Sequence, residues 1–443
     1  MKTPICDFVE KYAKKDNLRL HMPGHKGVGS DMHKRDITEI RGADSLYEAS
    51  GIIAESERYA SEIFSSRTYY STEGSSLAIR AMLYLATLCR PKGSGKVKIA
   101  AARNVHKVFV SAAALLDFEV DWICSDSDTY LSSGVNESDV ERYLLHCNEL
   151  PIAVYVTSPD YLGCIANISG IARVCHSFGV MLLVDNAHGA YLKFLNDSLH
   201  PIDLGADMCA DSAHKTLPAL TGAAYLHLSD RLDASLIGRA KNALMLFGST
   251  SPSYLTLASL DSLNPYLDGA YREELGAFIS CVDKAKATLS DAGYKLVGNE
   301  PMKITVAAKS YGYTGTEISE YLAALGIESE FSDPDFTVFM PTPQTEAYGL
   351  ERLTSTLLSL PKREKITEQP PKAVCGEQAI TIREAVFSDE ELLPVEACRG
   401  RILSSMMIGC PPAVPIAVSG EIITEETVEC FRYYGIDECA VVK

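Results

Sequence analysis

The chain has 443 residues, of which 47% are hydrophobic and 22% are charged. This length and balance indicate a folded protein with two or three hydrophobic cores and exclude a disordered or fibrous chain. The formal net charge of −17 argues against a nucleic-acid partner, because surfaces that bind phosphate backbones need clustered Lys and Arg side chains.

The N-terminal residues lack the apolar core of an export signal. Asp7, Glu10 and Lys11 interrupt the apolar positions there, and no apolar run in the chain approaches the ~20 residues of a membrane-spanning helix. We therefore expect a cytoplasmic protein. The 13 cysteines are scattered and include no Cys-x-x-Cys pair, so we expect most of them to be reduced core residues and we expect no metal site.

Helical and strand patterns alternate along the first half of the chain. Strands are predicted over 97–102, 118–123, 152–157, 180–184 and 223–228, and helices over 75–90, 106–117 and 136–147. This alternation predicts an α/β fold with a mainly parallel sheet that is covered on both faces. A strand over 303–308 and a helix over 316–325 predict a smaller α/β domain, and the polar, proline-bearing residues 361–372 predict a linker to a C-terminal lobe.

Three features lie just beyond predicted strands, where open α/β sheets bind ligands. They are Asp185, which follows the strand 180–184, Lys215, which follows a further strand end, and the run Gly74–Ser76 at a helix start. A lysine can bind an aldehyde, a carboxylate can keep a pyridine nitrogen protonated, and a helix N-terminus can hold a phosphate. Singly, they also fit a solvated lysine, a turn and a helix cap. Together they predict a site for pyridoxal 5′-phosphate (PLP).

Specific motifs follow one another in order along nearly the whole chain. They are Leu20–Gly27, Gly42–Tyr47, Ala102–Lys107, Thr157–Gly163, Asp185–Gly189, Ser212–Gly222, Ser249–Tyr254, Ala258–Asp261, Arg383–Ala385 and Gly400–Ile402. In these motifs the chain resembles the bacterial ornithine/lysine/arginine decarboxylases, in a short form without an N-terminal wing domain. The resemblance implies a PLP-dependent transferase fold of type I. The implied parts are an N-terminal segment (1–44), a large PLP-binding domain (45–262), a small α/β domain (263–365) and a C-terminal lobe (373–443).

The resemblance also implies roles for individual residues. His106 should stack on the pyridine ring, Asp185 should pair with its nitrogen, and Lys215 should carry the covalent link to PLP. Active sites of such folds lie between two subunits, so Ser249 and Thr250 are expected to reach the phosphate of the neighbouring chain in a homodimer or larger homo-oligomer. The implied cofactor-binding residues are Gly74, Ser75, Ser76, His106, Asp185, His188, Ser212, His214, Lys215, Ser249 and Thr250, and the implied catalytic residues are Lys215, Asp185, His106 and His214.

The implied reaction is the decarboxylation of arginine, lysine or ornithine to the corresponding amine and CO₂. Lys215 or His214 would then protonate the substrate α carbon, and the sequence does not choose between them. An acidic group should face the distal end of a basic substrate, for which Asp44, Glu48 and Asp160 are candidates. Alternatives are an aminotransferase or a lyase of the same fold, or a non-catalytic descendant that only binds PLP. An aminotransferase would need an arginine that clamps the substrate carboxylate.

Two departures from the family's motifs bear on the substrate pocket. Asp160 stands between Pro159 and Tyr161, where the family commonly has threonine. The segment Cys410–Pro415 lacks the tyrosine and the glycine of the family's Tyr-Pro-Pro-Gly-x-Pro motif. We therefore expect the scaffold of the family with an altered pocket.

Overall fold

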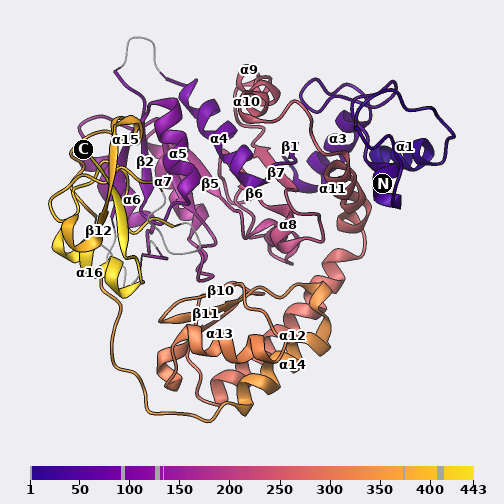
Figure 1. Cartoon of the computed structure of the whole chain (residues 1–443). Helices are drawn as coiled ribbons and strands as arrows, with labels where there is room; N and C mark the ends of the chain where they lie inside the picture. Colours follow the sequence, from indigo (N-terminus) through magenta and orange to yellow (C-terminus); the bar gives the residue numbers. More distant parts are fainter. Residues whose placement is uncertain (1, 91–94, 125–129, 133, 373–374, 407–413) are drawn as a thin grey trace. The chain divides into compact units, whose positions relative to one another are not determined.

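The structure is a computed structural model that describes residues 2–90, 95–124, 130–132, 134–372, 375–406 and 414–443. Most of the divergent segment Cys410–Pro415 thus lies outside the described residues. The chain forms two compact units, one of residues 1–90 and 181–274 and one of residues 91–180 and 275–443. Figure 1 labels many of the helices and strands that are named below.

The first unit contains the strands that carry most of the expected site. Its elements are α1 (Pro4–Ala13), α2 (Asp31–Arg35), α3 (Ile52–Phe64), β1 (Arg67–Ser71), α4 (Gly74–Thr87), β5 (Met181–Asp185), η1 (Ala190–Phe194), β6 (Met208–Asp211), α8 (Ala213–Thr216), β7 (Ala224–Leu228), α9 (Ala234–Ile237), α10 (Ala240–Phe247), α11 (Tyr254–Asp268) and the start of α12 (Tyr271–Asp291).

The second unit contains the rest of the large sheet, the small domain and the C-terminal lobe. Its elements are β2 (Lys98–Ala102), α5 (Lys107–Leu116), β3 (Glu119–Ile123), α6 (Glu137–His146), β4 (Ala153–Thr157), α7 (Ile168–Ser177), the rest of α12, β8 (Leu296–Val297), β9 (Ile304–Ala307), η2 (Ala308–Tyr311), α13 (Gly315–Ala324), β10 (Phe331–Ser332), β11 (Phe336–Phe339), η3 (Pro343–Thr345), α14 (Glu346–Ser359), α15 (Ile382–Phe387), β12 (Glu390–Pro394), η4 (Val395–Ala397), α16 (Glu425–Tyr433) and β13 (Glu438–Val442).

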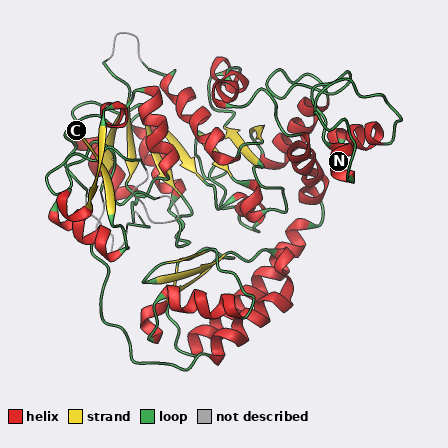
Figure 2. Cartoon of the chain, in the orientation of Figure 1, coloured by secondary structure: helices red, strands yellow, loops and turns green. Residues whose placement is uncertain are grey.

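The large sheet has seven strands and is mainly parallel, as the sequence predicts (Figure 2). In the first unit the strand order is β1-β7-β6-β5, where β5 and β6 are parallel and β7 is antiparallel to both of its neighbours. In the second unit the order is β4-β2-β3, and both pairings are parallel. Leu182, Leu183 and Val184 of β5 are fully buried, which is typical of a strand covered on both faces. The predicted α/β fold class is confirmed.

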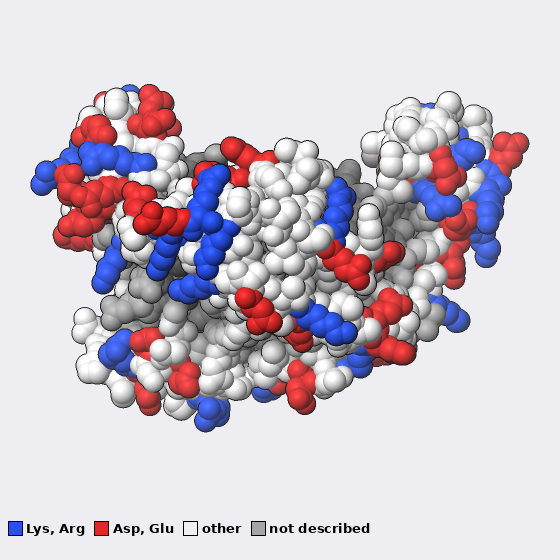
Figure 3. All heavy atoms as spheres, turned by 90° about the horizontal axis from the view of Figure 1, so that it is seen from below, with Lys and Arg blue, Asp and Glu red and all other residues white. Residues whose placement is uncertain are grey.

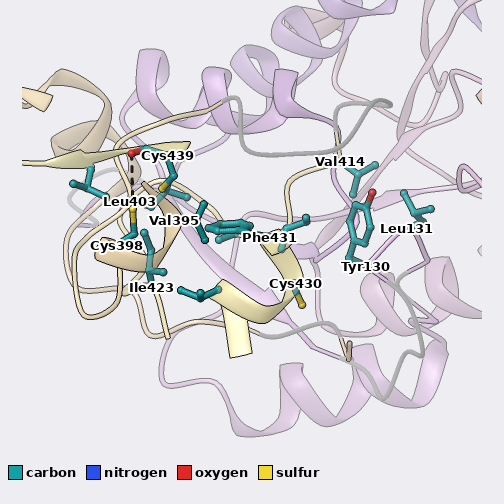
Figure 4. Close-up of a cluster of buried hydrophobic side chains, with 14 of the residues drawn as sticks. Tyr130, Leu131, Val395, Cys398, Leu403, Val414, Ile423, Cys430, Phe431 and Cys439 are labelled. Carbon is teal, nitrogen blue, oxygen red and sulfur yellow. Dashed lines mark hydrogen bonds between the residues drawn. The ribbon is translucent and has the colours of Figure 1, made fainter. Parts of the chain in front are cut away.

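The small domain and the C-terminal lobe each have a sheet of their own. The small domain holds a four-stranded antiparallel sheet in the order β10-β11-β9-β8, with α12, α13 and α14 on one of its faces (Figure 1). The lobe pairs β12 with β13 and packs a core around Val395, Leu403 and Phe431, to which Tyr130 also belongs (Figure 4). The domain boundaries drawn from the sequence stay predictions.

The cysteines depart from the sequence-based expectation at one pair. Cys124, just after β3, and Cys375, before α15, form a disulfide with their Cα atoms 6.6 Å apart. These two cysteines are exceptions to the expectation that most cysteines are reduced core residues. The two cysteines are 251 positions apart in the sequence, so no short spacing motif predicts the disulfide. Only the tertiary fold brings them together. Five of the ten other cysteines that the structure describes are buried.

The surface is consistent with the composition. Acidic and basic side chains are interspersed over the face shown in Figure 3. Within the described part of the chain, no helix combines the length and the apolar character that crossing a bilayer requires.

Asp333 gives the small domain a pH-dependent stability. Its Oδ1 accepts backbone N–H bonds from Asp335 and Phe336 at 2.8 and 2.6 Å, while Oδ2 is buried without a hydrogen-bond partner. Burial, with the nearby Asp335 charge, raises the Asp333 pKa from 3.8 to about 6. The folded state thus binds this proton more tightly than the unfolded chain, and the resulting stability is lost as the pH rises through the folded pKa.

We expect the free energy of unfolding of the wild type, relative to an Asp333→Asn variant, to fall by up to about 3 kcal/mol between pH ~4 and pH ~7. Urea unfolding of both proteins across this range measures the difference. A difference that does not change with pH would show that folding leaves the Asp333 pKa at its unfolded value.

Candidate active site

The ends of β5 and β6 bring two predicted site segments together. The strands are parallel neighbours in which Asp185 lies opposite Ala210, and the N–H of Asn186 donates to the Ala210 carbonyl at 3.0 Å. Asp185 is thus the last residue of β5, and the chain beyond β6 leads directly into Ser212 and Lys215. Both segments leave the sheet at its carboxyl edge, where open α/β sheets bind ligands.

Lys215 lies in the one-turn helix α8, in contact with a histidine from the neighbouring strand end. Its Nζ is 2.9 Å from Nε2 of His188, three residues after the end of β5. His188 is buried, so the imidazole sits where water competes weakly for the lysine amine. This contact pairs a nucleophilic amine with a base that can accept and return its proton.

Asp185 and His214 are each held by the backbone. Oδ1 of Asp185 accepts the N–H of Ala187 at 3.1 Å, and the side chain is 2% exposed. Nδ1 of His214 donates to the Ala223 carbonyl at 2.9 Å, which leaves Nε2 of the neutral ring as an acceptor. The lysine amine therefore contacts His188, whereas the adjacent His214 binds the main chain.

The predicted phosphate cradle lies at the N-terminus of α4. The N–H of Gly74 donates to the Gly222 carbonyl at 2.8 Å, and no side chain caps the N–H groups that follow it, so those of Ser75 and Ser76 are open to a ligand. Gly74 has φ +72°, and a Cβ built there would meet no atom within 4 Å, so there is open space beside this turn. The Ser212 hydroxyl donates to the Ser75 hydroxyl at 2.8 Å, which brings the β6 end to the same helix start. Ser76 occupies the next position of the helix.

The residues at these strand ends and at the start of α4 fit the chemical groups of PLP. Ser75, Ser76 and Ser212 would hold its phosphate at the helix start, because such N–H groups and hydroxyls suit a dianion, and Gly74 would leave space for it. Lys215 would bind its aldehyde carbon. The buried carboxylate of Asp185 would pair with its ring nitrogen.

Three further residues complete the predicted cofactor set: His106, Ser249 and Thr250. His106 belongs to the second unit, where it is the N-cap of α5 and accepts the N–H of Val108 at 3.1 Å. Ser249 and Thr250 follow α10 and are both exposed. The N–H of Ser249 donates to Glu73, which precedes α4, at 2.6 Å. Ser249 thus lies beside the cradle of its own chain, and the role of both residues in a neighbouring subunit stays a prediction.

The three acidic candidates for substrate recognition differ in environment. The Asp44 carboxylate accepts N–H bonds from Ser50 and Gly51 and from the first turn of α3, and these bonds outweigh its burial and lower its pKa. Asp44 therefore has a structural role at a helix start. Asp160 is 4% exposed and accepts the N–H of Cys164 at 2.8 Å, and burial raises its pKa. Glu48 is exposed.

Sequence reasoning missed a buried polar cluster next to the site. Asp211, the last residue of β6, lies with His200, His227, Cys209 and Asn186, and all of these side chains are fully buried. Among the described residues, His200, Cys209 and Asp211 form the one group of three whose donor atoms lie close enough together to hold a metal ion. No spacing along the chain marks this cluster, because its members come from two strands and two loops.

Comparison with known families covers nearly the whole chain. Residues 3–293 match the model of the Orn/Lys/Arg decarboxylase major domain, and residues 362–439 match the model of the Orn/Lys/Arg decarboxylase C-terminal domain. The chain is 30% identical to an arginine decarboxylase of Bacillus subtilis, over 96% of this chain and 92% of that protein. It is also 30% identical to an arginine decarboxylase of Halalkalibacterium halodurans, over 97% and 93% of the two chains.

Two less similar proteins are lysine decarboxylases. An inducible lysine decarboxylase of Escherichia coli is 22% identical over 96% of this chain and 75% of that protein. Among solved structures, a lysine decarboxylase of Francisella novicida matches the fold with a TM-score of 0.80 at 18% identity, over all of this chain and 81% of that one. The chain therefore belongs to the Orn/Lys/Arg decarboxylase family, and it is a PLP-dependent decarboxylase of a basic amino acid.

Proposed function

We propose that the chain decarboxylates arginine, forming the corresponding amine and CO₂. The observation that carries this choice is the near-complete alignment, at 30% identity, with two arginine decarboxylases of similar length. The lysine decarboxylase of E. coli is less similar, at 22%, and a quarter of its length has no counterpart in this chain. The alternatives of an aminotransferase, a lyase or a non-catalytic descendant have no comparable support.

In this proposal the residues around Lys215 handle the proton of the reaction. PLP, when bound, supplies an electron sink for the electron pair that remains on the α carbon after CO₂ departs. Asp185 carries the negative charge that favours a protonated ring nitrogen, and its burial strengthens the ion pair. Lys215 delivers a proton to the α carbon, where it stays in the product, and His188, 2.9 Å from its Nζ, passes a second proton taken up from solvent to the amine.

This assignment chooses between the two proton donors left open by the sequence. His214 binds the Ala223 carbonyl through Nδ1, whereas Lys215 has an imidazole partner that can relay protons. We therefore assign the proton transfer to Lys215, and we assign His214 to the phosphate end of the cofactor together with Ser212. His106 stays proposed as the residue that stacks on the pyridine ring.

A homodimer completes the proposal. Ser249 and Thr250 are exposed beside the helix start that we assign to the phosphate, so a second chain could share them. We place the enzyme in the cytoplasm, where the described cysteines other than the Cys124–Cys375 pair would stay reduced. The domain boundaries at 45–262, 263–365 and 373–443 belong to the same proposal.

The test is a comparison of substrates on the PLP-loaded enzyme. Release of CO₂ and formation of the amine are measured with arginine, lysine and ornithine, and kcat/KM is determined for each. We expect arginine to exceed the other two by ~100-fold or more, because a buried polar pocket discriminates strongly against a substrate that leaves its groups unpaired. A higher kcat/KM for lysine or ornithine would refute arginine as the substrate. A keto-acid product would instead indicate transamination.

A further inference from the structure

Asp211 is a buried carboxylate next to the active site that has no role in the reaction described above. It ends β6, immediately before Ser212, and no part of it is exposed. Its Oδ1 accepts Nδ2 of Asn186 at 2.7 Å and the thiol of Cys209 at 3.2 Å. Its Oδ2 lies 3.0 Å from Nε2 of His200 and 3.2 Å from Nε2 of His227. Four groups therefore converge on one carboxylate.

The surroundings of Asp211 stabilise its charge rather than a neutral acid. Burial alone would raise its pKa, but the electrostatic effect and hydrogen bonds of His200 and His227 outweigh burial and hold the pKa well below its usual range, while burial lowers the pKa of His227 itself. The thiol of Cys209, by contrast, has a pKa far above normal because of burial and the Asp211 charge. A protonated thiol is a hydrogen-bond donor and a poor metal ligand, so the cluster is better described as a hydrogen-bonded network.

The charge of Asp211 fixes the orientation of the Asn186 amide. Only the NH₂ group can face the carboxylate, so the amide oxygen must point the other way. That oxygen is buried and has no hydrogen-bond partner. It lies against Gly189, where a built Cβ would come within 2.0 Å of it. A buried acceptor left unpaired is costly, which indicates that another requirement sets this geometry.

The turn that begins at Asn186 explains why the amide keeps this orientation. The N–H of Gly189 donates to the Asn186 carbonyl at 2.8 Å, which closes the turn from 186 to 189. His188 lies within this turn, and its Nε2 contacts the Lys215 amine at 2.9 Å. Lys215 itself follows Asp211 by four residues on the neighbouring strand end. One carboxylate thus joins the two strand ends whose side chains must meet.

We propose that Asp211 is a positioning residue that, through Asn186, holds the 186–189 turn so that His188 stays against Lys215. The proposal rests on the proposed function, in which Lys215 and His188 handle the proton. It assigns no contact with substrate or cofactor to Asp211.

The test uses PLP-loaded Asp211→Asn, an isosteric change that removes the charge and one acceptor. We expect kcat to fall ~10- to 100-fold, because a small displacement of a proton-transfer group has effects of this size, while KM changes little. We also expect a shifted midpoint in the pH titration of the visible absorbance of lysine-bound PLP, measured without substrate. That second readout depends on the environment of Lys215 and not on which amino acid is the substrate, so a wrong substrate assignment would leave it unaffected.

Two further variants separate positioning from stability. Thr68→Val removes a partner of His227 on its far side, where Thr68 Oγ1 lies 2.9 Å from Nδ1, and should lower the melting temperature without moving the titration. Asn186→Ala keeps the Asp211 charge and breaks only the link, and should reproduce the titration shift even if Asp211→Asn does not fold.

Three results would overturn the proposal. The first is an Asn186→Ala enzyme with the kcat and titration midpoint of the wild type. The second is a Thr68→Val enzyme that shifts the midpoint as much as Asp211→Asn does. The third is one equivalent of zinc per chain in the purified wild-type enzyme, because Asp211 would then serve a metal.

Discussion

Replacing Lys215 with alanine is expected to reduce decarboxylation at least ~10⁴-fold and to remove the visible absorbance of lysine-bound PLP. The change deletes the amine that we assign to the covalent link and to the proton transfer, and general acid–base catalysis alone contributes ~10²- to 10⁴-fold. The amine has no substitute in α8, where its neighbours are His214 and Thr216. Measurement of CO₂ release and of the absorbance spectrum before and after borohydride reduction tests both roles.

Two controls belong with this experiment. Thermal unfolding shows whether Lys215→Ala is folded, which we expect because the lysine is only partly buried. Addition of a small primary amine should restore part of the activity, since the space vacated beside His188 can admit an amine of similar chemistry. An alanine variant that retains activity within tenfold of the wild type, or peptide mapping that finds the reduced cofactor on another lysine, would assign the wrong residue to the link.

Much of the large domain could be predicted because its elements follow local rules. The predicted strand 180–184 is β5 at Met181–Asp185, and the predicted helix 106–117 is α5 at Lys107–Leu116. Each element is a short, mostly apolar stretch of sequence, so its burial and its approximate length can be predicted from that stretch alone. The order of Asp185, Ser212 and Lys215 along the chain likewise marks the carboxyl ends of two strands, and the structure pairs those strands as parallel neighbours.

The contacts that complete the site could not be predicted in the same way. His188 and Lys215 are 27 positions apart, and their contact depends on the register of β5 against β6. Asp211 meets His200 and His227 only because β6 and β7 pair antiparallel and a loop returns to them. Such contacts join residues that carry no shared periodicity, so a single sequence gives no signal for them.

Asp44 shows how a residue type can mislead. Its carboxylate in a family motif suggested recognition of a basic substrate. The structure shows that both of its oxygens accept backbone N–H groups, including that of Gly51 at 2.7 Å, at the start of α3. A carboxylate with its acceptor capacity used in this way stabilises a helix terminus. Asp160 keeps its place as a candidate for substrate recognition as a buried carboxylate, whose pKa burial raises against the opposing charge of Lys303.

Replacing Asp185 with asparagine is expected to lower kcat ~10²- to 10⁴-fold while PLP stays bound. The amide keeps the shape of the side chain and can still accept the Ala187 N–H, which is 3.1 Å from Oδ1 in the wild type. It loses the negative charge, however, and in a buried setting that charge is what favours a protonated ring nitrogen and hence the electron sink. A 10³-fold loss corresponds to about 4 kcal/mol of transition-state stabilisation. Steady-state kinetics together with the PLP content of the purified variant measures both quantities.

The matched control is Asp207→Asn. Asp207 is also a buried carboxylate of the first unit, where it accepts the N–H of Leu182 at 2.8 Å near the start of β5, at the opposite end of the strand from Asp185. Loss of its charge should lower the melting temperature and leave kcat within a few-fold of the wild type. If both substitutions reduced kcat equally, the effect would come from the stability of β5, and the ring-nitrogen role of Asp185 would have to be abandoned. If only Asp185→Asn reduced kcat, with the cofactor still in place, the charge at the carboxyl end of β5 would be the group that the chemistry requires.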